Sequence, residues 1–72
     1  MFGKRLNQIR KQKGYTAKQI SDILSVSIRT YRNYESGYTF PSPDTLLLIA
    51  DTLNVSIDYL FGRTENPLVN VE

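Results

Sequence analysis

The stretch YTAKQISDILSVSIRTYRNYESG, residues 15–37, carries the signals for two short helices joined by a tight turn. Thr16 is a good N-cap residue, and Gln19 three positions later completes a capping box. Ser27 is placed to cap a second helix, which should end before Gly37. Only a few residues separate the two segments. The stretch therefore predicts one helix that ends near residue 24 and another over about 28–36.

The second of these helices has two faces of different chemistry. At about 100° per residue, one face is polar and basic with one aliphatic side chain, and it comprises Ile28, Arg29, Arg32, Asn33 and Ser36. Tyr31 and Tyr34 fall on the opposite face, which suits burial. A helix with an anchored aromatic back is suited to presenting its arginine and asparagine front to a partner.

Helix signals recur along the rest of the chain, and strand alternation is nearly absent. Phe2, Leu6 and Ile9 follow the spacing of one helix face. Further boundaries are Gly14 after that first helix, Ser42 with Pro43 and Asn54 around a fourth, and Ser56 and Gly62 around a fifth. We therefore expect an all-α, five-helix domain over residues 1–63, followed by a tail or linker over 64–72. The expected core is Leu6, Ile9, Ile20, Ile23, Tyr31, Tyr34, Leu46, Ile49, Leu53, Val55 and Leu60.

The charges are divided unequally between the two halves of this 72-residue chain. Residues 1–33 hold eight basic side chains and one acidic one, whereas residues 34–72 hold one basic and six acidic ones. A basic half in a small domain favours a polyanionic partner, most often nucleic acid, over a merely solvated basic surface. No apolar run is long enough to span a bilayer, and the start is too polar for a secretory signal. We expect a cytoplasmic protein that has no membrane partner.

The composition argues against catalysis. The chain contains no histidine and no cysteine, which removes the commonest general base, the commonest metal ligand and thiolate chemistry. The remaining serines, lysines and carboxylates show no spacing typical of a nucleophile with its base or of a metal site. We therefore expect no enzyme activity, no cofactor, no metal and no small-molecule ligand.

Several segments, taken in order, carry a family resemblance. They are LNQIRKQKGYT (6–16), VS before the second helix quoted above, YESG (34–37), PSPDTLLLIADTLNVS (41–56) and SIDYLFG (56–62). Over about residues 3–63 the chain resembles the lambda-repressor-like, Xre/Cro-type helix-turn-helix DNA-binding family. The resemblance implies a compact five-helix fold in which the second and third helices form the helix-turn-helix. In that motif the third helix enters the DNA major groove.

The resemblance also implies which side chains meet DNA. The base-reading positions are Ser27, Ile28, Arg29, Arg32 and Asn33. Arginine can bond guanine, asparagine can bond adenine, and isoleucine can pack on a thymine methyl. For both arginines, phosphate contact or plain solvation is the alternative. The implied phosphate contacts are Thr16, Ala17 and Lys18 at the start of the second helix, and Gly37, Tyr38 and Thr39 in the loop after the third.

Two further features follow from the resemblance. Arg10 and Glu35 match a recurrent salt bridge between the first and third helices, which we expect to be structural. Ser25 stands where many relatives have glycine, a position that often needs positive φ.

Members of the family usually dimerise on two-fold operators. The expected homodimer interface is Leu48, Ile57, Tyr59 and Phe61. The LVNVE tail, residues 68–72, could pair across a dimer, lead to a further domain or be disordered. The function expected is that of a bacterial or phage transcriptional regulator, most simply a repressor on a palindromic operator. Alternatives are an antitoxin or restriction-control regulator, or a protein-interaction module with the same fold.

Overall fold

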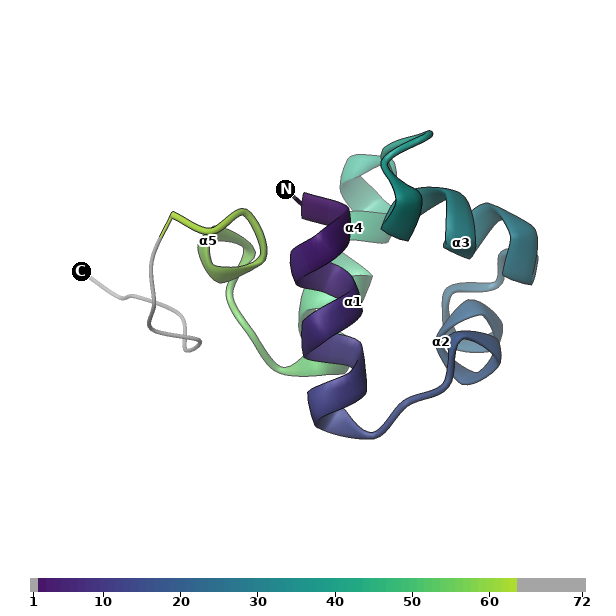
Figure 1. Ribbon diagram of the computed structural model, residues 1–72, viewed down its shortest axis with the longest axis horizontal. Coiled ribbons are helices and arrows are strands. Elements are labelled where there is room, and N and C mark those ends of the chain that lie inside the picture. The colour runs from purple at the N-terminus through teal and green to yellow at the C-terminus, as the bar shows by residue number, and fades with distance from the viewer. Residues whose placement is uncertain (1, 64–72) are drawn as a thin grey trace.

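The computed structural model describes residues 2–63, and the expected tail over 64–72 lies outside them (Figure 1). Five helices follow one another: α1 (Phe2–Lys13), α2 (Ala17–Leu24), α3 (Ile28–Ser36), α4 (Pro43–Leu53) and α5 (Ile57–Leu60). No strand occurs in residues 2–63. The predicted all-α class and the order of the helices are confirmed.

Each helix after the first begins at a hydroxyl side chain. The oxygens of Thr16, Ser27, Ser42 and Ser56 each accept a hydrogen bond from the backbone N–H three residues further on. At α2 the bond is reciprocated, because the Thr16 N–H donates to Gln19 Oε1 at 2.8 Å. Helices this short are unstable alone, so these caps and the shared core determine where each one starts.

Residues in the left-handed conformation end most of the helices. Gly14 and Gly37 have φ values of 84° and 85°. Ser25 and Asn54 adopt the same region, with φ values of 59° and 57°. The positive φ expected at Ser25 is therefore present, and a serine there is more strained than the glycine that the position suits.

All five helices contribute to one core. The buried apolar side chains are Phe2, Leu6, Ile9, Ala17, Ile20, Leu24, Tyr31, Tyr34, Ile49, Ala50, Leu53, Val55 and Leu60. The prediction that Ile23 belongs to the core is wrong, since its side chain is 43% exposed. The buried stripe of α2 runs along Ala17, Ile20, Ser21 and Leu24, and Ile23 lies about 110° away from its centre at 100° per residue. Leu46 is only partly buried.

The helices are arranged so that α3 lies at one side of the domain. Figure 1 shows α1 in the middle, with α5 on one side of it and α2 and α3 on the other. The rings of Phe2, Phe40 and Phe61 form an aromatic cluster, with centroid separations of 4.8 to 5.7 Å. This cluster joins the start of α1, the loop after α3 and the end of α5. Within the described residues, none of the helices combines the length and apolarity needed to cross a membrane.

Candidate nucleic-acid interface

The back of α3 is anchored by its two tyrosines. Tyr31 is completely buried and Tyr34 nearly so. Their rings meet edge to face with centroids 6.2 Å apart, a favourable arrangement for an aromatic pair. The opposite face of α3 is consequently directed away from the core.

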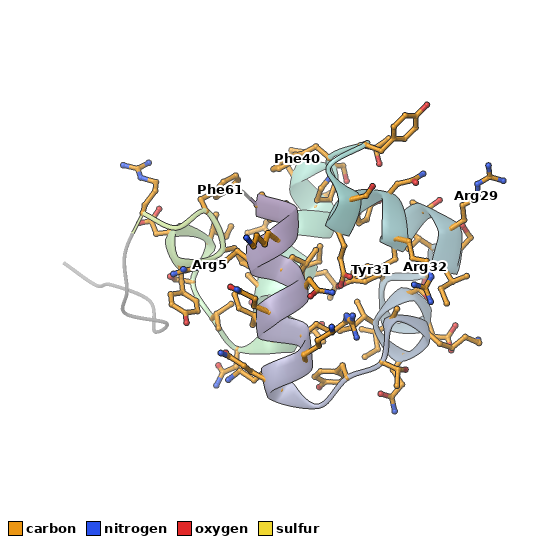
Figure 2. The ribbon with its side chains drawn as sticks, in the orientation of Figure 1. Arg5, Arg29, Tyr31, Arg32, Phe40 and Phe61 are labelled. Atoms are coloured by element: carbon orange, nitrogen blue, oxygen red, sulfur yellow. The ribbon has the colours of Figure 1, made fainter. Side chains whose placement is uncertain are left out.

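That opposite face carries the side chains expected to read bases. Ile28, Arg29 and Arg32 are exposed, and Asn33 is partly buried. Figure 2 shows Arg29 projecting away from the helices. Among the side chains that the structure describes, none forms an ion pair with either arginine. The two guanidinium groups are therefore available to an external anion or base.

Ser27 differs from the other expected base-reading residues, because its hydroxyl already has partners. Ser27 Oγ accepts the Thr30 N–H at 3.0 Å and lies 3.0 Å from Thr30 Oγ1. A hydroxyl has one donor and two acceptor sites. Ser27 therefore keeps little capacity for a base edge while it caps α3.

The end of α3 is tied to α1 through the carboxylate of Glu35. The expected ion pair with Arg10 is present, with 2.7 Å between Arg10 Nε and Glu35 Oε2. The hydroxyl of Tyr31 donates to the same oxygen at 2.5 Å, and Asn7 Nδ2 donates to Glu35 Oε1 at 2.8 Å. Arg10 also donates to the Tyr15 carbonyl at 2.9 Å. This Glu35 network connects α1, α3 and the segment before α2.

The network shifts the ionisation of its members. Burial raises the pKa of Glu35, but hydrogen bonds from Arg10, Tyr31 and Asn7 outweigh it and hold the pKa below its usual value. Burial and the hydrogen bond to Glu35 raise the pKa of the Tyr31 hydroxyl, and the bond to Glu35 raises that of Arg10. At neutral pH the carboxylate is therefore charged and the phenol is protonated.

The start of α2 retains two free backbone donors. The capping box occupies the N–H groups of Thr16 and Gln19. The N–H groups of Ala17 and Lys18 lie in the first turn and have no acceptor within the helix. The side chain of Lys18, however, pairs with Asp22 at 3.1 Å in an exposed, solvent-screened contact. Of the three residues expected to meet phosphate here, two thus have unoccupied amides.

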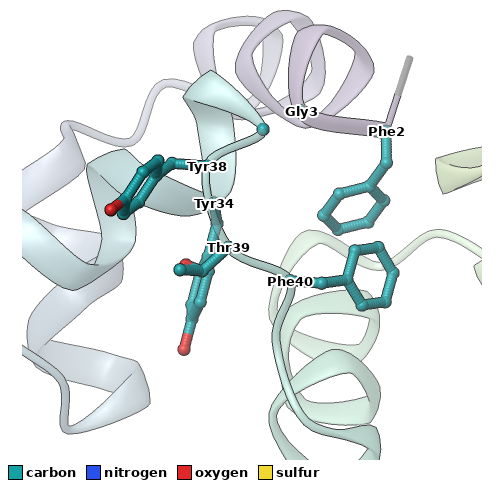
Figure 3. Close-up of a pocket in the computed structure, with 7 residues that line it drawn as sticks. Phe2, Gly3, Tyr34, Tyr38, Thr39 and Phe40 are labelled. Carbon is teal, nitrogen blue, oxygen red and sulfur yellow. The ribbon is translucent and has the colours of Figure 1, made fainter.

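The loop after α3 uses its amides internally. The N–H groups of Tyr38 and Thr39 donate to the Asn33 carbonyl at 3.0 and 3.3 Å, and that of Gly37 donates to the Tyr34 carbonyl. Only the hydroxyls of Tyr38 and Thr39 are left for a phosphate. Tyr38 is 79% exposed. It lines a pocket of about 310 Å³ together with Phe2 and Phe40, and Figure 3 shows its ring directed away from theirs.

The residues expected at a dimer interface lie in different environments. Leu48 on α4 is 41% exposed. Ile57 lines a groove of about 340 Å³ between α4 and α5. Tyr59 is half-buried under Arg5, whose guanidinium carbon lies 4.4 Å from the ring centroid, and Phe61 belongs to the aromatic cluster. Leu48 is thus the most exposed of the four, whereas Ile57, Tyr59 and Phe61 are all partly buried against the core.

Sequence reasoning missed two of the contacts that hold α3. Asn7 and the hydroxyl of Tyr31 both donate to Glu35. The spacing of Tyr31 and Glu35 by one helical turn was the available signal. Among the described residues, no group of three or more potential metal ligands comes together.

Comparison with known proteins agrees with this geometry. A helix-turn-helix family model matches residues 6–60 of the chain. The chain belongs to the lambda-repressor-like, Xre/Cro-type helix-turn-helix family. The match begins within α1 and extends to the end of α5, so it includes most of α1 and all of α2 to α5.

Two helix-turn-helix relatives are regulators from bacteria or their phages. The chain is 43% identical over 64 residues to the HTH-type transcriptional regulator ImmR of Bacillus subtilis, covering 89% of this chain and 50% of ImmR. It is 42% identical over 59 residues to the cryptic phage CTXphi transcriptional repressor RstR of Vibrio cholerae, covering 82% of this chain and 53% of RstR. The chain therefore spans about half the length of these relatives.

A solved helix-turn-helix structure has a similar fold. The crystal structure of SinR, a master regulator for biofilm formation, in complex with DNA matches with a TM-score of 0.76 and 29% identity. The match covers 85% of this chain and 98% of that one.

Proposed function

We propose that this chain binds double-stranded DNA sequence-specifically and acts as a transcriptional regulator. The observation that carries the proposal is the front of α3, where two exposed arginines without ion-pair partners in the described structure stand on a helix with a buried aromatic back. The arginines of such a front can donate hydrogen bonds to the acceptor atoms of guanine in the major groove. The basic first half of the chain supports the same proposal through its attraction to phosphate.

The base-reading roles are divided by chemistry. Arg29 and Arg32 are the donors for guanine, and Asn33 is the side chain for adenine. Ile28 packs on a thymine methyl. Ser27 contributes mainly by capping α3, since its hydroxyl is shared with Thr30.

Phosphate contacts hold the domain in register. We assign them to the Ala17 and Lys18 amides at the start of α2, where the helix dipole favours an anion. Thr16 adds its hydroxyl proton. Tyr38 and Thr39 act through their side chains, and Gly37 allows the turn that presents them, with φ of 85°.

Repression as a homodimer is the finer form of the proposal. RstR is a repressor by name, and a two-fold dimer would place two copies of α3 about one helical turn of DNA apart. The proposed interface is Leu48, Ile57, Tyr59 and Phe61, of which Leu48 offers the most exposed apolar surface. The DNA-binding unit is residues 1–63, and the site of action is the cytoplasm.

Selection from a pool of random duplexes at two salt concentrations tests the proposal. We expect enrichment of a palindrome, with affinity that falls steeply as the salt concentration rises. Enrichment of a single half-site would support base reading by α3 but contradict the proposed homodimer. Weak binding without any enrichment would contradict sequence-specific recognition and favour a protein-binding role for the domain.

A further inference from the structure

One stripe of α1 meets the end of the recognition helix. Gly3, Asn7 and Arg10 are spaced four and three residues apart, so they lie on the same face of α1. The side chains of Asn7 and Arg10 bond Glu35, and Gly3 lies against the backbone carbonyls of Tyr34 and Glu35. The resemblance pointed only to Arg10, and the other two contacts emerge from the structure.

Gly3 lets the backbones of α1 and α3 approach each other. A β-carbon at Gly3 would lie 2.3 Å from the Glu35 carbonyl oxygen and 2.7 Å from that of Tyr34. Both obstacles are backbone atoms, so rotation of a side chain could not relieve the overlap. Any larger residue at Gly3 would have to move the C-terminal end of α3 or the start of α1.

Asn7 holds one particular oxygen of Glu35. Glu35 Oε2 has two short partners, Arg10 Nε at 2.7 Å and the Tyr31 hydroxyl at 2.5 Å. Glu35 Oε1 has Asn7 Nδ2 at 2.8 Å, and its other partner, Arg10 Nη2, is distant at 3.4 Å. Asn7 is therefore the main partner of Oε1, and it stops the carboxylate from turning about its bonds to Arg10 and Tyr31.

We propose that Gly3 and Asn7 are positioning residues for base reading, a role that rests on the function proposed above. Arg32 and Asn33 lie within one turn of Glu35. At about 100° per residue, Arg32 is about 60° from Glu35 around α3, and Asn33 is about 160° from it. A change in the gap between α1 and α3 therefore displaces these side chains from the base edges. Phosphate contacts tolerate such a displacement better, because they depend on charge and not on the fixed geometry of a base edge.

The test compares Asn7→Ala and Gly3→Ala with a matched control, Gln8→Ala. Gln8 is an exposed amide on the next position of α1. For each variant, affinity is measured for the duplex selected by the wild type and for an unrelated duplex at the same salt, together with thermal stability. Asn7→Ala should lower affinity for the selected duplex about 10-fold, the value of one bidentate base contact, and leave affinity for the unrelated duplex unchanged.

Gly3→Ala should have a similar or larger effect on the same ratio, although alanine is normally the better helix residue. Gln8→Ala should leave the ratio as in the wild type. If Asn7→Ala keeps the wild-type ratio, or lowers both affinities in parallel with its stability, the positioning role is wrong. If the wild type itself selects no duplex, the proposed function fails first. A Gly3→Ala variant that does not fold leaves the decision to Asn7→Ala.

Discussion

Replacing Tyr31 with phenylalanine should destabilise the domain without opening a cavity, because only the buried hydroxyl is removed. That hydroxyl donates to Glu35 Oε2 at 2.5 Å, and a hydrogen bond to a charged group contributes about 1.5–3 kcal/mol. Oε2 keeps Arg10 Nε at 2.7 Å, so the carboxylate is not left without a partner. We therefore expect a loss near the lower limit, about 1.5 kcal/mol. For a domain of this size, that loss lowers Tm by about 6–12 °C.

Tyr34→Phe provides the matched control. Tyr34 is also buried on α3, but its hydroxyl has no hydrogen-bond partner within residues 2–63. Its removal should change the free energy of unfolding by no more than about 0.5 kcal/mol. Thermal unfolding of the wild type and both variants at neutral pH, followed by circular dichroism, makes the comparison. Equal losses for Tyr31→Phe and Tyr34→Phe would refute the reasoning, since the Glu35 bond would then contribute nothing particular.

The same network predicts how stability depends on pH. The pKa of Glu35 is lower in the folded protein than its usual value of 4.5, so the ionised carboxylate stabilises the fold. This contribution is present above the pKa of the unfolded chain and is lost as the pH falls through the folded pKa. Tyr31→Phe should show a smaller loss on acidification, because one of the bonds that lower the pKa is gone. A wild type and variant with parallel acid transitions would contradict this link.

Three further substitutions test separate features of the molecule. Asp22→Asn should free Lys18 from its ion pair at 3.1 Å. The slope of log affinity against log salt concentration should then become steeper by about 0.9 per protomer. DNA titrations at several salt concentrations measure this slope. Ser25→Gly should raise the free energy of unfolding by about 1 kcal/mol, because φ is 59° there, as measured by denaturant titration. Leu48→Glu should weaken self-association in sedimentation equilibrium, because it places a charge in the proposed apolar interface.

Each of these substitutions has a control variant or an outcome that would contradict its prediction. Asp51→Asn, in the acidic half of the chain, should leave the salt slope unchanged, and an equal change would show that only net charge matters. Gly37→Ala should destabilise where Ser25→Gly stabilises, since φ at Gly37 is 85°. If Leu48→Glu leaves the oligomeric state unaltered, the proposed interface is wrong.

Much of the fold was readable from local chemistry. The hydroxyl caps at Thr16, Ser27, Ser42 and Ser56 all form as expected, because an N-cap needs only its own helix. The anchored back of α3 was equally readable, since its angular pattern depends on helix geometry alone. The Ile23 error shows the limit of this approach, because apolarity does not reveal which side of a short helix meets the core.

Features that depend on tertiary approach could not be predicted. Nothing local to Gly3 reveals that the α3 backbone lies against it. Asn7 resembles any polar residue on an amphipathic helix until Glu35 is placed beside it. Tyr38 and Thr39 were expected to contact phosphate, but the sequence does not reveal that the amides of both residues bond the Asn33 carbonyl. Their predicted phosphate role consequently depends on side chains alone.

The central claim is that the front of α3 reads base sequence, and Arg29 tests it most directly. The selected duplex would be changed one base pair at a time, and the affinity of wild type and Arg29→Ala measured for each change. The wild type should lose about 1–3 kcal/mol at each contacted base pair. Arg29→Ala should lose discrimination at one position per half-site and keep it elsewhere. An equal loss of affinity for every duplex, with discrimination intact at all positions, would place Arg29 on phosphate and contradict the claim.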